Sequence, residues 1–147
     1  MAVVKLKRLD KRAKVPTRAT SGSAGYDISA LLDSPVTIAP GEVRMIPTGL
    51  AIELEDSSVV ALIYPRSSLA SKHGITLANC VGVIDSDYRG ELQMPVINLS
   101  NEPYTISLGE RISQLVLTPV LIPDIEEVEE LSDTVRGTGG FGSTGKL

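Results

Sequence analysis

Proline and glycine interrupt this chain of 147 residues so often that long helices are excluded. Between the interruptions lie short runs that are continuously apolar or alternate apolar with polar residues, as β-strands do. The predicted strands are Val3–Leu9, Val36–Ile38, Glu42–Ile46, Ala51–Leu54, Val59–Tyr64, Ile75–Ala78, Leu92–Asn98 and Ile112–Leu117. Short strands at this spacing predict an all-β protein, an antiparallel sandwich or barrel. One short helix is expected, at Ser67–His73.

The chain divides into a core and a tail. Its length is typical of one domain, and no segment of it repeats another. We expect residues 1–131 to form the β domain and residues 132–147 to form a separate, mobile C-terminal lid. The acidic segment Ile125–Glu130 that precedes the lid is interpreted as an exposed last strand or a linker.

Composition and charge exclude several classes of protein. A net charge of −4 argues against a nucleic-acid partner, and the apolar runs are too short to span a membrane. The N-terminus lacks the apolar region of a signal peptide, so a cytoplasmic protein is expected. The single cysteine and the single histidine, Cys80 and His73, exclude a disulfide framework, an ordinary zinc site and a Cys/His catalytic pair. Cys80 can be explained as a small buried apolar residue.

The last dozen residues could not form a hydrophobic core. Five glycines surround Phe141, the only phenylalanine, with Arg136 before it and hydroxyl side chains after it. Exposed N–H groups on such a strap can wrap an anion, arginine suits phosphate, and an aromatic ring can stack on a base. The segment therefore predicts a lid over a phosphorylated, planar molecule; the alternative is a disordered tail.

A second candidate anion site lies where the predicted helix begins. Arg66, Ser67 and Ser68 follow an apolar strand and open the helix, whose first N–H groups are free. The same residues are also consistent with a helix that is simply capped by serine.

The segment Gly82–Gly90 is interpreted as a hairpin turn between two strands. Asp85 comes directly after an apolar pair, and a partly enclosed carboxylate there could orient and deprotonate a water. Tyr88 could pack flat against a sugar, and Asn79 offers a donor and an acceptor that suit the imide edge of a base.

Two further strands begin with polar residues. Asp27 could hold waters around a magnesium ion or pair with an arginine, and the role of Arg111 is equally open. Gln114 lies inside the apolar run that starts at Ile112, so its amide needs hydrogen-bond partners.

The order of these blocks is more specific than any one of them. The blocks AGYD (24–27), PRSSLA (65–70), GVIDSDYRG (82–90), GERISQLV (109–116) and RGTGGFGSTG (136–145) together resemble the trimeric dUTPase family, the deoxyuridine triphosphate nucleotidohydrolases. The resemblance runs from about Val15 to Gly145. In that family the second block often carries glycine where Ser68 stands here, which leaves the local backbone less free.

The resemblance implies a β jelly roll and a homotrimer with three sites at the subunit interfaces. Each site would take the first, second and fourth blocks from one chain, the hairpin from another and the tail from the third. The implied reaction is hydrolysis of dUTP to dUMP and pyrophosphate by attack of water on the α-phosphorus, with Mg²⁺ as cofactor. It would limit uracil in DNA and supply dUMP for dTMP synthesis.

The resemblance also implies a role for each matched residue. Asp85 would orient the attacking water, and Tyr88 would pack on the deoxyribose and exclude a 2′-hydroxyl. The base, phosphates and metal would be held by the remaining matched residues: uracil by Asn79, Val83, Ile84 and Gln93; the phosphates by Arg66, Ser67, Ser68 and Gln114; the γ-phosphate by Arg136, Gly142 and Ser143; the outer face of uracil by Phe141; and Mg²⁺, through water, by Asp27.

Two alternatives stay open at this point. A dCTP deaminase-like enzyme shares the jelly roll, but it needs a proton-transfer group facing C4 of the base, and the hairpin here resembles the hydrolase version. A module that binds nucleotide and signals through its closed tail would also fit the sequence.

Overall fold

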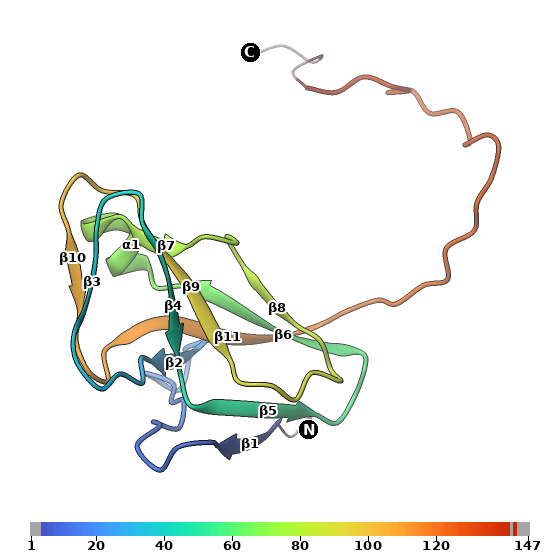
Figure 1. Ribbon diagram of the computed structural model, residues 1–147. Helices are drawn as coiled ribbons and strands as arrows, with labels where there is room; N and C mark the ends of the chain where they lie inside the picture. Colours follow the sequence, from blue (N-terminus) through green and yellow to red (C-terminus); the bar gives the residue numbers. More distant parts are fainter. Residues whose placement is uncertain (1–3, 142, 144–147) are drawn as a thin grey trace.

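The protein is an all-β jelly roll with one short helix, seen here in a computed structural model that describes residues 4–141 and 143 (Figure 1). The strands are β1 (Val4–Arg8), β2 (Tyr26–Ser29), β3 (Val36–Ile38), β4 (Val43–Pro47), β5 (Leu50–Leu54), β6 (Val59–Pro65), β7 (Ile75–Leu77), β8 (Gly82–Ile84), β9 (Gln93–Asn98), β10 (Tyr104–Ile106) and β11 (Arg111–Pro119). The helix is α1 (Ser67–His73).

Every strand pairing among the described residues is antiparallel, as predicted. The largest sheet has the order β2-β11-β6-β8, and a second sheet has the order β4-β9-β7. The pairs β1-β5 and β3-β10 complete the fold. Because β11 is inserted between β2 and β6, segments far apart in the sequence lie side by side.

Aliphatic side chains from all these sheets form one core. The strands alternate buried and more exposed residues, as in β9, where Met94, Val96 and Asn98 are buried. The largest fully buried apolar side chains are Ile28, Ile38, Ile46, Leu50, Leu92, Met94, Val96 and Ile106. None of these side chains is aromatic. The core that supports the strands is therefore formed by aliphatic side chains.

The helix forms over the predicted residues, and the residue that follows it explains where it ends. Gly74 takes the left-handed conformation (φ 65°) and donates its N–H back to the helix, which ends it. Leu69 is the buried residue of the helix. Arg66 occupies the N-cap position without a side-chain capping bond, so the explanation by serine capping is wrong. Ser67 and Ser68 lie exposed in the first turn.

Most predicted strands match the structure within two residues, and three short strands differ. β2 was expected only as a strand that begins near Asp27, β8 lies inside the segment predicted as a turn, and β10 was not predicted. β8 and β10 have three residues each, too few to show a period of two. Cys80 is exposed, with φ 64°, so the prediction of a buried cysteine is wrong.

The tail leaves the body after β11. Val120 donates its N–H to the carbonyl of Ser58, and beyond it the chain runs outward without strand or helix (Figure 1). The segment Ile125–Glu130 is therefore a linker in this structure rather than a strand. In the described part of the chain, no helix is long and apolar enough to cross a membrane.

We predict that Asn98→Ala destabilises the fold by about 2–3 kcal/mol, because buried partners lose their hydrogen bonds. The Asn98 amide donates to the carbonyls of Ile38 (2.9 Å) and Glu102 (2.7 Å), and its oxygen accepts from Ser100. Thr105→Ala is the matched control, since it removes an exposed hydroxyl pair with Thr37. Urea unfolding at fixed protein concentration measures both; equal effects would contradict the prediction.

Candidate active site

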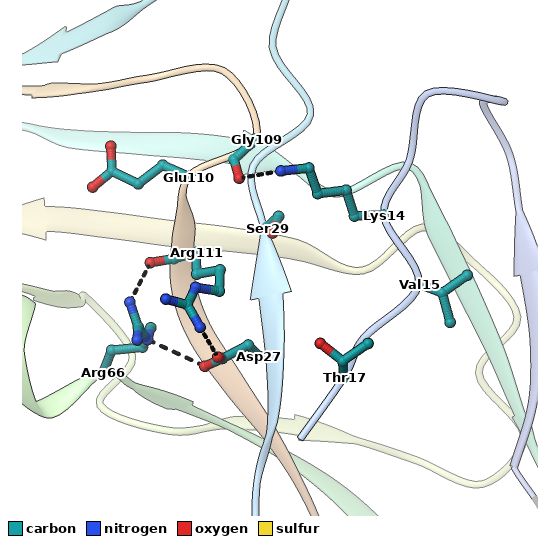
Figure 2. A pocket seen from close by; sticks show the side chains of 9 residues that line it. All are labelled: Lys14, Val15, Thr17, Asp27, Ser29, Arg66, Gly109, Glu110 and Arg111. Atoms are coloured by element: carbon teal, nitrogen blue, oxygen red, sulfur yellow. Dashed lines mark hydrogen bonds and ion pairs between the residues drawn. The ribbon is translucent and has the colours of Figure 1, made fainter. Parts of the chain in front are cut away.

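An ion-pair cluster forms where three strands of the large sheet meet (Figure 2). Asp27 on β2 pairs with the Nε of Arg66 (3.2 Å) and with a terminal nitrogen of Arg111 (2.8 Å). Arg66 also donates to the backbone carbonyl of Arg111 at 3.1 Å. The Asp27 side chain is only 14% exposed, whereas that of Arg111 is 53% exposed, so the carboxylate is shielded and the cluster opens to water on the arginine side. The first, second and fourth blocks thus meet within a single chain.

A β-bulge turns Arg111 toward this cluster. In the pairing with β2, Gln114 lies opposite Asp27 and Ser113 opposite Ile28, but Arg111 lies opposite Ser29. One extra residue therefore sits in β11 between Arg111 and Ser113, and it reverses the alternation of side chains. As a result Arg111 shares a face of the sheet with Gln114 and Asp27.

Gln114 is held beside the same cluster. Its amide donates to the carbonyl of Pro65 at 3.2 Å, which supplies the hydrogen-bond partner that the sequence requires. The backbone of Gly25 passes so close that an added Cβ would lie 2.5 Å from the Gln114 oxygen. Glycine at this position is therefore a requirement of the site.

The cluster lines a cavity of about 390 Å³. Its charged lining residues are Lys14, Arg66, Arg111, Asp27 and Glu110, which leaves one excess positive charge. Glu110 is engaged on its other side, where it accepts hydrogen bonds from the Tyr104 hydroxyl and the Ser107 N–H. Burial and the bond to Glu110 raise the pKa of Tyr104 to about 12, so this tyrosine stays neutral. The excess positive charge of the lining suits an anion.

A second pair of cavities lies at the hairpin. β8 pairs with β6, whereas β9 pairs with β4 and β7, so these consecutive strands belong to different sheets. A cavity of about 100 Å³ opens between them, lined in part by Asn79, Val83 and Gln93. A neighbouring cavity of about 450 Å³ is lined in part by Asp85 and Tyr88.

The prediction of a hairpin is wrong in the strict sense, because β8 and β9, the two arms of the segment called the hairpin here, do not pair with each other. The turn between them is also shorter than predicted. Gly82–Ile84 is strand β8, and the turn follows it, closed by a bond from the Tyr88 N–H to the Asp85 carbonyl. The Tyr88 hydroxyl donates to the carbonyl of Glu91 at 3.0 Å. Asp85 is exposed in the single chain rather than partly enclosed.

The structure separates the predicted site residues into three groups. Asp27, Arg66 and Gln114 lie together, with Ser67 and Ser68 following Arg66 in the chain. The hairpin residues line other cavities, which share no residue with the first cavity. Arg136, Phe141 and Ser143 lie exposed on the tail, and Gly142 is outside the described residues. The sequence did not single out Lys14 or Glu91, because no motif marks either.

The fold and its cavities define a jelly-roll protein with a cationic pocket and a separate narrow slot in which Asn79 and Gln93 are the polar side chains. A family model described as dUTPase matches residues 11–145. The chain therefore belongs to the dUTPase family.

Individual relatives agree with the family. The chain is 52% identical over 139 residues to the deoxyuridine 5′-triphosphate nucleotidohydrolase of Hahella chejuensis, covering 95% of this chain and 91% of that protein. It is 51% identical over 144 residues to the enzyme of the same name from Neisseria meningitidis, covering 97% and 96%. Among solved structures, the dUTPase of Staphylococcus bacteriophage 80alpha with dUpNHpp matches with a TM-score of 0.82 at 30% identity, covering 97% of this chain and 98% of that one.

We predict that Gly25→Ala lowers the affinity for inorganic tripolyphosphate about tenfold, because the new Cβ displaces the Gln114 amide from the anion pocket. Gly22→Ala is the matched control in the same loop, where an added Cβ meets nothing within 4 Å. Titration calorimetry measures both variants beside the parent. Equal affinities for all three proteins would show that Gln114 does not contact the anion.

Proposed function

We propose that this protein hydrolyses dUTP to dUMP and pyrophosphate. The observation that carries the proposal is the convergence of Asp27, Arg66 and Arg111 on one cationic pocket, with Gln114 opposite Asp27 on the next strand and a separate slot between β8 and β9. The relatives with about half of their residues identical are named for this activity.

Uracil would occupy the slot between β8 and β9. β8 is the edge strand of its sheet, so the backbone groups on its outer side have no ladder partner there. The backbone of Val83 and Ile84, with the Asn79 amide and the arm at Gln93, can bond the imide edge of the base. A slot of about 100 Å³ leaves little space for the methyl of thymine, and cytosine would leave polar groups unpaired.

The sugar and the attacking water would lie in the wider hairpin cavity. Asp85 acts there as the base that orients and deprotonates water, and Tyr88 forms the wall against the deoxyribose. The exposure of Asp85 in the single chain fits this role, since bound nucleotide would cover it.

The triphosphate would lie against the cationic pocket. Arg66, Gln114 and the hydroxyls of Ser67 and Ser68 bind its oxygens and neutralise the charge that develops on the leaving pyrophosphate. The chain needs no catalytic histidine, because the nucleophile is a water and the leaving group stays anionic.

Mg²⁺ fits this site as an ion carried largely by the phosphates. The described residues contain no group of three or more His, Cys, Asp or Glu side chains that could hold a metal alone. Asp27 is a carboxylate facing the phosphate pocket, and Mg²⁺ commonly combines one carboxylate with waters and phosphates. The ion would supply further charge neutralisation; Asp27 would hold it through water. A phage phi11 dUTPase variant of 25% identity is described as coordinating a structural Mg(II) ion.

The tail would close over the bound nucleotide, and the working unit would be a homotrimer. Arg136 and the backbone near Gly142 and Ser143 meet the γ-phosphate, while Phe141 covers the base. Two observations support shared sites: the anion and hairpin cavities share no lining residue in one chain, and the tail runs outward from the body after β11 (Figure 1). The exposed tail side chains Leu121 and Ile122 also need a partner surface. A cytoplasmic location stays a prediction from the sequence.

We predict that Asp85→Asn abolishes hydrolysis while its affinity for dUpNHpp stays within about tenfold of the parent, because the amide keeps the shape but cannot take a proton. Pyrophosphate release and ammonia release are assayed together across dUTP and the four common deoxynucleotides. Turnover near the parent level would remove Asp85 as the base. Ammonia release from dCTP would instead favour a deaminase.

A mixing experiment tests the shared site. Full-length Asp85→Asn chains are refolded together with chains that end at Ser132, two nearly inactive parents. If hairpin and tail come from different subunits, random assembly makes about a quarter of the sites intact. We expect activity well above both parents, with heterotrimers confirmed by mass spectrometry. Heterotrimers no more active than either parent would contradict sharing, and loss of oligomer on truncation would show that the tail is structural.

A further inference from the structure

We infer that Glu91 is a positioning residue that holds the sugar wall and thereby sets the preference for deoxyribose over ribose. The inference rests on the proposed function, because it assigns a role within the same hairpin cavity. The Glu91 side chain lines this cavity. Its carboxylate accepts a hydrogen bond from the backbone of Gly49, in the body of the protein.

Glu91 joins three parts of the hairpin through separate atoms. One carboxylate oxygen accepts the N–H of Gly49 at 2.7 Å, and the other accepts the Gln93 amide at 3.3 Å. Its backbone carbonyl accepts the Tyr88 hydroxyl at 3.0 Å. The residue therefore ties the tyrosine wall and the outgoing arm to a turn outside the hairpin.

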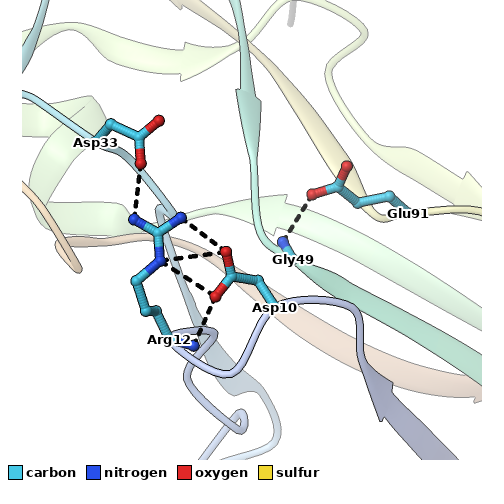
Figure 3. A network of polar contacts seen from close by, with 5 residues as sticks. All are labelled: Asp10, Arg12, Asp33, Gly49 and Glu91. Atoms are coloured by element: carbon cyan, nitrogen blue, oxygen red, sulfur yellow. Dashed lines mark hydrogen bonds and ion pairs between the residues drawn. The ribbon is translucent and has the colours of Figure 1, made fainter.

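The turn that anchors Glu91 through the Gly49 N–H (Figure 3) is tightly enclosed by its neighbours. Gly49 has φ 66°, and an added Cβ would meet the side chains of Leu31 at 2.5 Å and Ala13 at 3.0 Å. Its carbonyl accepts the N–H of Leu9 at 2.8 Å. A backbone so enclosed is a fixed reference point for the carboxylate.

An ion-pair network braces the loop around that turn. Arg12 bonds both oxygens of Asp10 and reaches Asp33 at 2.7 Å (Figure 3). The hydrogen bonds from Arg12 lower the pKa of Asp10 to about 2, so the network stays charged at all ordinary pH values. The loop that encloses Gly49 is thus held on its outer side as well.

The tyrosine ring has little freedom while these bonds persist. It lies against Gly90, where an added Cβ would overlap the Tyr88 hydroxyl. The position of the Tyr88 hydroxyl in turn depends on the position of the Glu91 carbonyl, to which it donates its hydrogen bond. The Glu91 carbonyl belongs to the same planar peptide unit as the Leu92 N–H, which Leu50 accepts at 2.8 Å, so the carboxylate is the second anchor of this peptide. Without the carboxylate anchor the peptide can tilt about that one bond, and the ring can swing out of the position that excludes a 2′-hydroxyl.

The fold itself does not depend on Glu91. The next residue, Leu92, is buried and held by two bonds, from the Thr48 hydroxyl to its carbonyl (2.7 Å) and from its N–H to Leu50 (2.8 Å). The arm therefore stays in register when the carboxylate is removed. The expected consequence is loss of selectivity with the trimer and its melting temperature close to the parent.

The test compares Glu91→Ala with Glu91→Gln. Glutamine keeps an oxygen for the Gly49 N–H, so it should restore what alanine loses. We expect the ratio of kcat/KM for dUTP over UTP to fall about tenfold in the alanine variant and to stay within about twofold in the glutamine variant. Exchange of the Gly49 amide proton, measured by NMR, should accelerate only in the alanine variant.

Glu42→Ala is the matched control. Glu42 likewise accepts a backbone N–H, that of Ala39 at 2.9 Å, but in a turn that lines none of the cavities at the hairpin. It should leave the dUTP/UTP ratio unchanged. A ratio that stays at the parent value in Glu91→Ala, or falls equally in Glu91→Gln or Glu42→Ala, overturns the inference.

The same variants also separate this inference from the proposed function. If the parent binds dUpNHpp more tightly than UpNHpp but releases no pyrophosphate from dUTP, hydrolysis is wrong, and the affinity ratio then tests Glu91. A tenfold fall in that ratio for alanine, restored by glutamine, supports the role; an unchanged ratio overturns it. A parent without preference for the deoxy analogue overturns both.

Discussion

The site depends on one pairing, the insertion of β11 between β2 and β6. That strand carries Gln114 and Arg111, and its two neighbours carry Asp27 and lead to Arg66, so three distant segments meet at one end of a sheet. The hydrogen-bond ladder fixes their spacing, and the bulge after Arg111 decides which face its side chain occupies. A one-residue slip in this register would move Gln114 to the opposite face and dissolve the pocket.

In the hairpin, by contrast, the residues are not positioned by pairing between its own two strands. Strands joined by a short turn usually pair with each other, but β8 and β9 pair with different neighbours. Backbone groups left free between them form a slot whose shape is set by two sheets at once. Selectivity for a base can then rest on main-chain atoms, which substitutions disturb less than side chains.

Much of the fold could be predicted from the sequence, because strongly patterned segments carry their own signal. The helix is bounded by Arg66 and by a glycine, and the seven-residue strand β6 is apolar throughout. The strands β8 and β10 could not be predicted, because three residues show no period and their pairing partners are distant. The bulge in β11 could not be predicted either, since it is defined only against β2.

For the site, the sequence supplied the chemistry of the matched residues, and the order of the blocks supplied their grouping. It could not show that Asp27 is already paired with two arginines, because Arg111 reaches it only through the bulge. Nor could it single out Glu91, whose partner Gly49 lies 42 positions away in the chain. Residues that hold others in place carry no motif, since any side chain of the right reach can do so.

The separation of the β body from the tail that follows β11 has a physical reason. Under the proposed function, discrimination of base and sugar requires walls that do not yield, and the residues assigned to those walls lie on strands and turns next to the core. Enclosing a triphosphate requires a segment that can leave again, and such segments come from the least stable parts of a chain. The tail after β11 meets the second requirement, because almost all of its described residues are exposed. Under the proposed function, one chain can therefore combine a selective pocket with a closing lid only if the lid segment is not part of the core that supports the pocket.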